Sequence, residues 1–254
     1  LPFIEDPIIA DYVDRLGRKV LDTLPPQPFK YHFYVVKQDV YNAFALPGGY
    51  IFINSGLIEA MAHEDELAGI LGHEISHVVC RHISDRIEQS QKISWVSLAG
   101  VAASIFLGVT GEGEAAGAVM QGSKAAAQSA MLANSRENEI QADQIGLYLL
   151  TEAGYDPEGL LRILKEMRKK NWFGSVIPDY MRTHPATDDR IAYISNWVQD
   201  PDKKPPRPAH IDPYQFNLVR LRLTALYKDA DIAEKQLQAE LRKTPDDPLT
   251  NYGY

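Results

Sequence analysis

The residues best suited to chemistry are two histidines and a glutamate in the segment His73-Glu74-Ile75-Ser76-His77. Positions four apart share one face of an α-helix, so the imidazoles of His73 and His77 can reach the same metal ion. Zinc accepts imidazole and carboxylate ligands, and a catalytic zinc site has three protein ligands and an open position for water. Glu74 can take a proton from that water, whose pKa the metal lowers toward about 7. The spacing therefore predicts a Zn2+ ion with Glu74 beside it.

A third protein ligand is required, and the residues just after His77 do not supply one. In the metzincin pattern a glycine and a third histidine would stand at positions 80 and 83, but this chain has Cys80 and Ile83. On a continued helix His82 would point about 140° away from His77. We therefore expect His82 to be an exposed polar residue and look for the third ligand elsewhere.

Two acids further along the chain, Glu139 and Asp143, are spaced four apart on a predicted helix. Glu139 can bind the metal while Asp143 accepts the N–H of a ligand histidine and fixes its tautomer. An isolated acid pair at this spacing is more often a solvated helix face. The need for a distant carboxylate favours the ligand interpretation here. A purely structural zinc site is disfavoured, because such a site usually has four protein ligands.

The elements around these residues indicate an α+β fold that is mainly helical. Asp6 and Pro7 begin a helix with one apolar stripe, and the aromatic and β-branched run 31–36 indicates a strand. Pro47-Gly48-Gly49 is turn chemistry between two further strands. The strands are predicted at 31–36, 42–46 and 49–53, and later helices at 63 to about 82, at 135–153, from Asp156-Pro157 onward and at 187–198.

Proline and charge concentrate in residues 201–212, which we expect to be a linker after a domain of residues 1–200. Beyond it, 213–243 is predicted to form two helices. The spacing of Ala233, Leu237, Leu241 and Pro245 is typical of the second half of a tetratricopeptide repeat. We therefore predict that 213–254 begins a tetratricopeptide-like domain; a helical hairpin packed on the main domain is the alternative.

Composition narrows the possible partners. The net charge of −8 argues against a nucleic-acid partner, which needs clustered Lys and Arg. The single cysteine, Cys80, excludes a disulfide within the chain and a Cys-rich zinc site. The sequence opens without the basic and apolar segments of a signal peptide.

The apolar run at 93–109 has 17 residues, at the lower limit for crossing a bilayer. We expect a helix beside or over the active-site cleft, with membrane contact as the alternative. The following segment, to about residue 130, is rich in Gly and Ala and is expected to form a movable cover.

Three motifs in this order resemble peptidase family M48: NAFALPGGYIFINSGL, HEISH and ENEIQAD. The resemblance covers about residues 1–200 and is closest to the soluble periplasmic BepA-like branch, in which a tetratricopeptide domain follows the protease. It implies a gluzincin-type zinc endopeptidase with His73, His77 and Glu139 as metal ligands. It further implies Glu74 as general base and Asp143 as the residue that orients a ligand histidine.

The resemblance also implies a substrate and a location. The strand residues Asn42, Ala43, Phe44 and Ala45 would flank the cleft, where a polypeptide substrate can add to the sheet edge. For alternate side chains of this strand, core packing is the other interpretation. The implied location is the periplasm, with misfolded or unassembled envelope or outer-membrane proteins as substrates. A chaperone-like assembly or binding factor with a latent zinc site is the alternative function.

His184, in THPATDDRI, matches the HPxxxxRI pattern of M48 relatives, which implies a place near the metal. Its imidazole can donate to the oxyanion of the tetrahedral intermediate, or it can occupy the fourth zinc position and hold the enzyme latent. We favour the second role.

Overall fold

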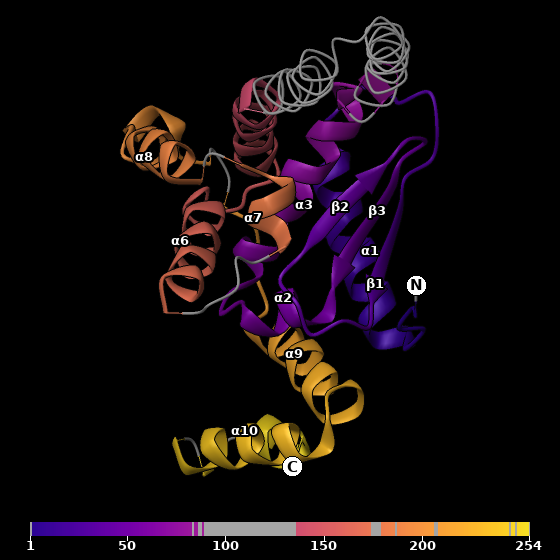
Figure 1. Ribbon diagram of the computed structural model, residues 1–254, viewed down its shortest axis with the longest axis vertical. Coiled ribbons are helices and arrows are strands. Elements are labelled where there is room, and N and C mark those ends of the chain that lie inside the picture. The colour runs from indigo at the N-terminus through magenta and orange to yellow at the C-terminus, as the bar shows by residue number, and fades with distance from the viewer. Residues whose placement is uncertain are drawn as a thin grey trace, which may run out of the picture.

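The computed structural model describes residues 2–82, 84–85, 88, 136–173, 179–185, 187–205, 208–243, 245–246 and 248–253 of the 254-residue chain. These residues form a mainly helical α+β fold with a small sheet at one side, which confirms the predicted fold class (Figure 1). Among them, no helix has both the length and the apolar character needed to cross a bilayer. The cover and the membrane contact predicted for 93–130 lie outside the described residues.

The sheet has three strands, β1 (His32–Val36), β2 (Ala43–Leu46) and β3 (Tyr50–Asn54), in the order β1-β3-β2. β1 runs parallel to β3, and β2 runs antiparallel to it. The β2–β3 turn contains Gly48 and Gly49 at φ of 90° and 87°, a backbone region that favours glycine. The Pro-Gly-Gly signal therefore marked the turn correctly. In the strand order β1-β3-β2, β2 is an edge strand of the sheet.

Side chains alternate between the two faces of this sheet, as they do in any strand. The inward set packs into the main core with helix α1 (Pro7–Leu21); it consists of Phe33, Val35, Ala43, Ala45, Ile51 and Ile53. Asp6 caps α1 as expected, because its side chain accepts hydrogen bonds from the backbone of Ile8 and Ile9. The outward set is aromatic, and the rings of Phe44 and Tyr34 both stack on Phe52.

Helix α3 (Glu64–Val79) runs through the middle of the molecule, and nearly all of it is buried. It follows the short helix α2 (Ser55–Ala60) and packs against α1, β2 and α6 (Glu158–Phe173). A further helix covers 136–152, and α7 (Asp179–Thr183) and α8 (Thr187–Val198) complete this part. The observed bounds match the predicted helices closely, while α2 and α7 were not predicted.

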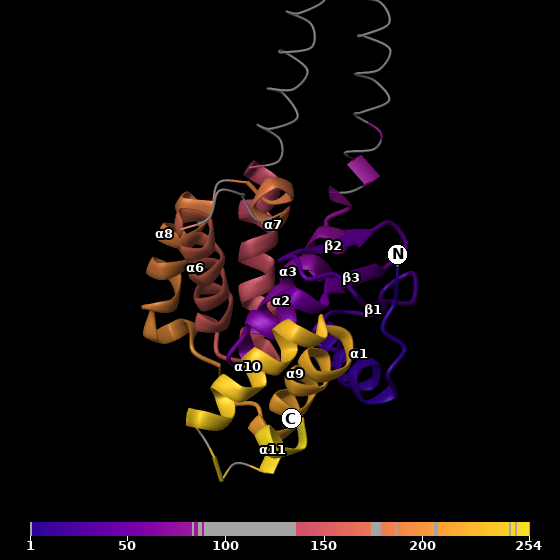
Figure 2. The same ribbon diagram turned by 60° about the horizontal axis from the view of Figure 1, so that its bottom comes forward.

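The remaining elements are the turn η1 (Pro201–Lys203) and the helices α9 (Pro213–Tyr227), α10 (Ala230–Lys243) and α11 (Pro248–Gly253). The helices α9, α10 and α11 gather at one end of the molecule (Figure 2). α9 contributes Phe216, Val219 and Leu223 to the main core, and α10 packs on α9. The two helices predicted after residue 212 are present; the tetratricopeptide assignment stays a prediction.

Candidate metal centre

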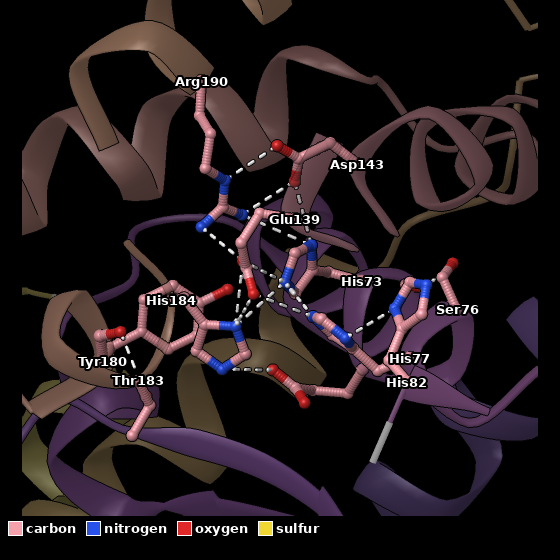
Figure 3. Close-up of polar contacts among 12 residues, drawn as sticks. His73, Ser76, His77, His82, Glu139, Asp143, Tyr180, Thr183, His184 and Arg190 are labelled. Atoms are coloured by element: carbon pink, nitrogen blue, oxygen red, sulfur yellow. Dashed lines mark hydrogen bonds and ion pairs between the residues drawn. The ribbon is translucent and has the colours of Figure 1, made fainter. Parts of the chain in front are cut away.

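Four buried side chains from three separate parts of the chain meet at one point (Figure 3). His73 and His77 project from α3, Glu139 from the helix of 136–152, and His184 from the turn after α7. Each offers one nitrogen or oxygen, and these atoms all lie within 4.8 Å of one another. The structure thus brings together residues that are up to 111 positions apart in sequence.

The spacing of these atoms suits a tetrahedral ion. His73 Nε2 lies 3.0 Å from His77 Nε2 and 3.3 Å from a Glu139 oxygen, and His77 Nε2 lies 3.4 Å from the other Glu139 oxygen. His184 Nδ1 lies 3.3 Å from His73 Nε2 and 3.0 Å from Glu139. Bonds of 2.0–2.1 Å around a tetrahedral zinc separate neighbouring ligand atoms by about 3.3–3.4 Å. The donor set therefore fits zinc in both chemistry and spacing.

Behind this cluster, His73 is held by an acid and an arginine. Its Nδ1 lies 2.9 Å from Asp143 Oδ1, the arrangement expected for a carboxylate that fixes the tautomer of a ligand histidine. Arg190 donates two hydrogen bonds to Asp143, at 2.7 and 2.8 Å, and lies 3.0 Å from Glu139. The role of Arg190 was not predicted from the sequence. Its signal was a charged residue on the apolar stripe of α8, with Thr187, Ile191 and Ile194.

The charges in the cluster stabilise one another. Burial opposes ionisation of Glu139 and Asp143, but the Arg190 charge and the neighbouring histidines outweigh burial and lower the pKa of both carboxyls. Burial also opposes the charge on Arg190, yet the two carboxylates raise its pKa well above the usual value. Both acids and Arg190 are therefore charged in the folded protein, which burial alone would forbid.

Glu74 and His184 face each other across the site. His184 Nε2 lies 3.5 Å from Glu74 Oε1, and burial raises the pKa of Glu74 above its usual value. His184 stacks on the ring of Tyr180, with centroids 4.3 Å apart. The backbone N–H of Tyr180 donates to the Tyr41 carbonyl at 3.0 Å, which ties α7 to the chain entering β2. Tyr180 was not foreseen from the sequence.

His82 was predicted to be exposed, and this prediction is wrong. The side chain is 3% exposed, with Nδ1 3.0 Å from His77 Nδ1 and Nε2 3.0 Å from Gln141 Oε1. α3 ends at Val79, and Arg81 adopts a left-handed φ of 59° that turns the chain back toward His77. The extrapolation along a straight helix therefore failed.

The predicted substrate residues lie at the sheet edge beside α3. Ala43 and Ala45 are buried toward the core, and Phe44 is half-buried on the outward face. Asn42 precedes β2, and its carbonyl accepts a hydrogen bond from the backbone of Asn54 at 3.0 Å. β2 contacts α3, the helix that carries His73 and Glu74.

Sequence comparison decides the family. The family model described as "Peptidase family M48" matches residues 7–198 of this chain, and this range includes every member of the cluster. The chain belongs to peptidase family M48. This confirms the resemblance drawn from the three motifs and gives the His/Glu cluster its context.

The relatives of this chain carry protease names. The chain is 32% identical over 226 residues to a beta-barrel assembly-enhancing protease of Yersinia pestis, covering 89% of this chain and 46% of that protein. It is 30% identical over 195 residues to the protein of that name in Escherichia coli K12, covering 77% and 40%. The mitochondrial metalloendopeptidase OMA1 of Schizosaccharomyces pombe is 28% identical over 194 residues, covering 76% and 54%. The chain spans about half the length of these relatives.

Proposed function

We propose that this chain carries the catalytic site of a zinc endopeptidase. The observation that supports this most strongly is the buried set of donor atoms from His73, His77 and Glu139, spaced as the ligands of a tetrahedral ion, with Glu74 beside it. Membership of a peptidase family supports peptide-bond hydrolysis as the reaction of such a site. The names of the relatives, protease and metalloendopeptidase, support the same activity.

In this proposal His73 and His77 would hold zinc through Nε2, and Glu139 would hold it through its carboxylate. Asp143 accepts the Nδ1–H of His73, so the lone pair of Nε2 faces the metal. Arg190 offsets the charge of the two buried carboxylates and keeps them in place. We assign Arg190 to the support of the site, since its guanidinium is directed at both acids.

Zinc held here would polarise the scissile carbonyl and lower the pKa of the attacking water. Glu74 takes a proton from that water as its oxygen bonds to the carbonyl carbon. Glu74 then delivers the proton to the leaving amine as the C–N bond breaks. Burial favours this exchange, because the raised pKa of Glu74 brings proton uptake and release closer in energy near neutral pH.

His184 has Nδ1 beside the three proposed ligands, and we assign it to the fourth position, where it holds the site latent. A donor to the oxyanion would instead direct an N–H toward the substrate. The two roles differ in outcome: His184→Ala should raise proteolysis if His184 caps the metal. It should lower kcat, with zinc content unchanged, if His184 stabilises the oxyanion.

The proposed substrate is an extended polypeptide that pairs with β2. Hydrogen-bonded pairs alternate along antiparallel strands, and Asn54 bonds to Asn42. Ala43 and Ala45 therefore direct their backbone N–H and C=O groups away from β3. A substrate strand can add there by backbone hydrogen bonds, with Phe44 alongside on the outward face.

We place this activity in the periplasm, on misfolded or unassembled envelope proteins. The support is the similarity to proteases whose names refer to β-barrel assembly. A chaperone-like role with a latent metal site is the second candidate, and the position of His184 favours it. Both functions can belong to one protein if His184 leaves the metal only when a client binds.

Cleavage of casein or an unfolded outer-membrane protein tests the proposal, with Glu74→Gln and the exposed Glu152→Gln as matched variants. Glu74→Gln should lose hydrolysis by at least about 1,000-fold while retaining zinc, because only the base is removed. Glu152→Gln should cleave like the wild type. Equal cleavage by both variants would refute the assignment of Glu74, and suppression of client aggregation by both would support the chaperone-like role.

A further inference from the structure

A chain of polar contacts runs from the helix of 136–152 to the back of His77. Gln141 Oε1 lies 3.0 Å from His82 Nε2, and His82 Nδ1 lies 3.0 Å from His77 Nδ1. The rings of His77 and His82 meet edge to face, with centroids 5.1 Å apart, and both are buried. Figure 3 shows His82 on the side of His77 away from His73.

The order of donors along this chain follows from Gln141. Gln141 Oε1 can only accept, so His82 Nε2 carries a proton and donates it. A neutral His82 then has a lone pair on Nδ1, which accepts the Nδ1–H of His77. His77 Nε2 is left without a proton, and this is the atom directed at the metal cluster. A charged His82 would instead place its own N–H against that of His77.

The backbone conformation at Arg81 indicates that the contact between His82 and His77 has a functional role. Arg81 stands in the left-handed region, which residues other than glycine, asparagine and aspartate rarely adopt. That turn brings His82 back onto His77 after the end of α3. A rare conformation that aims one side chain at a functional group is a reason to look for a role for that side chain.

We propose that His82 is a positioning residue, oriented by Gln141, that fixes the ring and tautomer of His77 for metal binding. This inference rests on the proposed zinc site and extends it. The helix that supplies Glu139 orients His73 directly through Asp143 and His77 through Gln141 and His82. One helix thus sets the geometry of all three ligands.

The tautomers can be read without metal, from long-range 1H–15N correlations in histidine-labelled, metal-free protein. His77 should be protonated at Nδ1 and His82 at Nε2. A His77 protonated at Nε2 would overturn the inference. Because no zinc is involved, this result is independent of whether the proposed function holds.

Zinc affinity, measured by competition with a chelator, tests the consequence. His82→Leu should weaken binding by about 10–100-fold, the usual effect of losing a residue that orients a ligand. His82→Asn places Oδ1 where Nδ1 stood, keeps an acceptor for His77 and should bind within about threefold of the wild type. His63→Leu, at the exposed N-cap of α3, should bind like the wild type.

The unfolding midpoint of the metal-free variants separates orientation from general stability. Equal zinc losses in the Leu and Asn variants, following equal losses of stability, would contradict a positioning role. If His82→Leu does not fold, the tautomers of the wild type and the affinity of His82→Asn decide the matter. A wild type that binds no zinc but shows the stated tautomers would refute the proposed function and leave the hydrogen-bond order intact.

Discussion

His73 and His77 lie one helical turn apart, yet their surroundings shift their pKa values in opposite directions. Burial and Arg190 oppose a charge on His73, but hydrogen bonds to Asp143 and Glu139 outweigh them and raise its pKa to about 9. Burial dominates at His77 and lowers its pKa to about 3. Without metal, the proton on His73 supplies positive charge beside the carboxylates of Asp143 and Glu139. A bound zinc ion would supply that positive charge instead.

This difference makes zinc binding depend on pH. Below about pH 9 zinc must displace the His73 proton, whereas His77 is already neutral above about pH 3. The apparent association constant should therefore rise about tenfold per pH unit between roughly pH 6 and 8, with about one proton released per ion. Calorimetry in buffers of different ionisation enthalpy measures that number. An affinity independent of pH over this range would contradict the assignment of His73.

Glu139 and Glu137 form a matched pair for testing the carboxylate ligand. Glu139 is buried in the cluster, whereas Glu137 is exposed two positions earlier on the same helix. Glu139→Ala should lose bound zinc, and Glu137→Ala should keep it. Asp143→Asn should retain metal with affinity or activity reduced about 10–100-fold. A greater sensitivity at Glu137, read from metal content after purification, would show the ligand assignment to be wrong.

His73 and His77 could be proposed as metal ligands from the sequence because their spacing places both side chains on one face of a helix. Arg190 and His82 could not be predicted in the same way. The role of Arg190 depends on two acids far away in sequence, and the burial of His82 depends on a left-handed turn at Arg81. Neither condition is visible in a local pattern.

Among the helices, glycines set how closely α3 and the helix of 136–152 approach each other. Gly72 on α3 faces Gly146 on the helix of 136–152, and a Cβ added to Gly146 would lie 3.1 Å from the backbone nitrogen of His73. This separation is tighter than ordinary van der Waals contact. The close approach helps to bring Glu139 within reach of His73 and His77.

Gly146→Leu should therefore push the two helices apart. The expected cost is about 1–3 kcal/mol of unfolding free energy, as for other overpacked cores, with a parallel loss of zinc affinity as Glu139 moves. Tyr148→Leu introduces the same side chain at an exposed position of that helix and is the control. Urea unfolding and chelator competition measure both effects. Equal stability of the two variants would show that this contact does not set the site.

The longer elements were predictable because each has a strong periodic or punctuating signal. Asp6-Pro7 marked the start of α1, and Pro47-Gly48-Gly49 marked the hairpin turn. The short helices α2 and α7 have six and five residues, too few for a helical period to stand out. α7 nevertheless positions His184. Part of the site therefore depends on a helix that was not predicted from the sequence.

At the scale of the whole molecule, α9 belongs to two hydrophobic groups. Phe216, Val219 and Leu223 join the main core, where α9 packs on α1 and α2. Leu221 joins a separate small cluster with Leu237 of α10 and Leu249 of α11. Arg222 also forms an ion pair with Asp6, the cap of α1. The predicted boundary at 201–212 therefore precedes a helix whose apolar side chains join the main hydrophobic core.

Two truncations distinguish these groups. A chain ending at residue 228 should lose no more than about 1 kcal/mol of unfolding free energy, because α10 and α11 pack mainly on α9. A chain ending at residue 212 should lose at least about 3 kcal/mol, because three buried apolar residues of α9 leave the core. Equal stability of the two chains in urea would show that 213–254 is a separate domain, as the sequence alone predicted.

The central claim is that one zinc ion sits among His73, His77 and Glu139. Anomalous diffraction from crystals of the zinc-loaded protein, collected on both sides of the zinc absorption edge, tests it most directly. We expect a single peak about 2.0–2.1 Å from Nε2 of both histidines and within about 2.2 Å of a Glu139 oxygen. A map with no peak there, or with zinc bound only elsewhere, would contradict it.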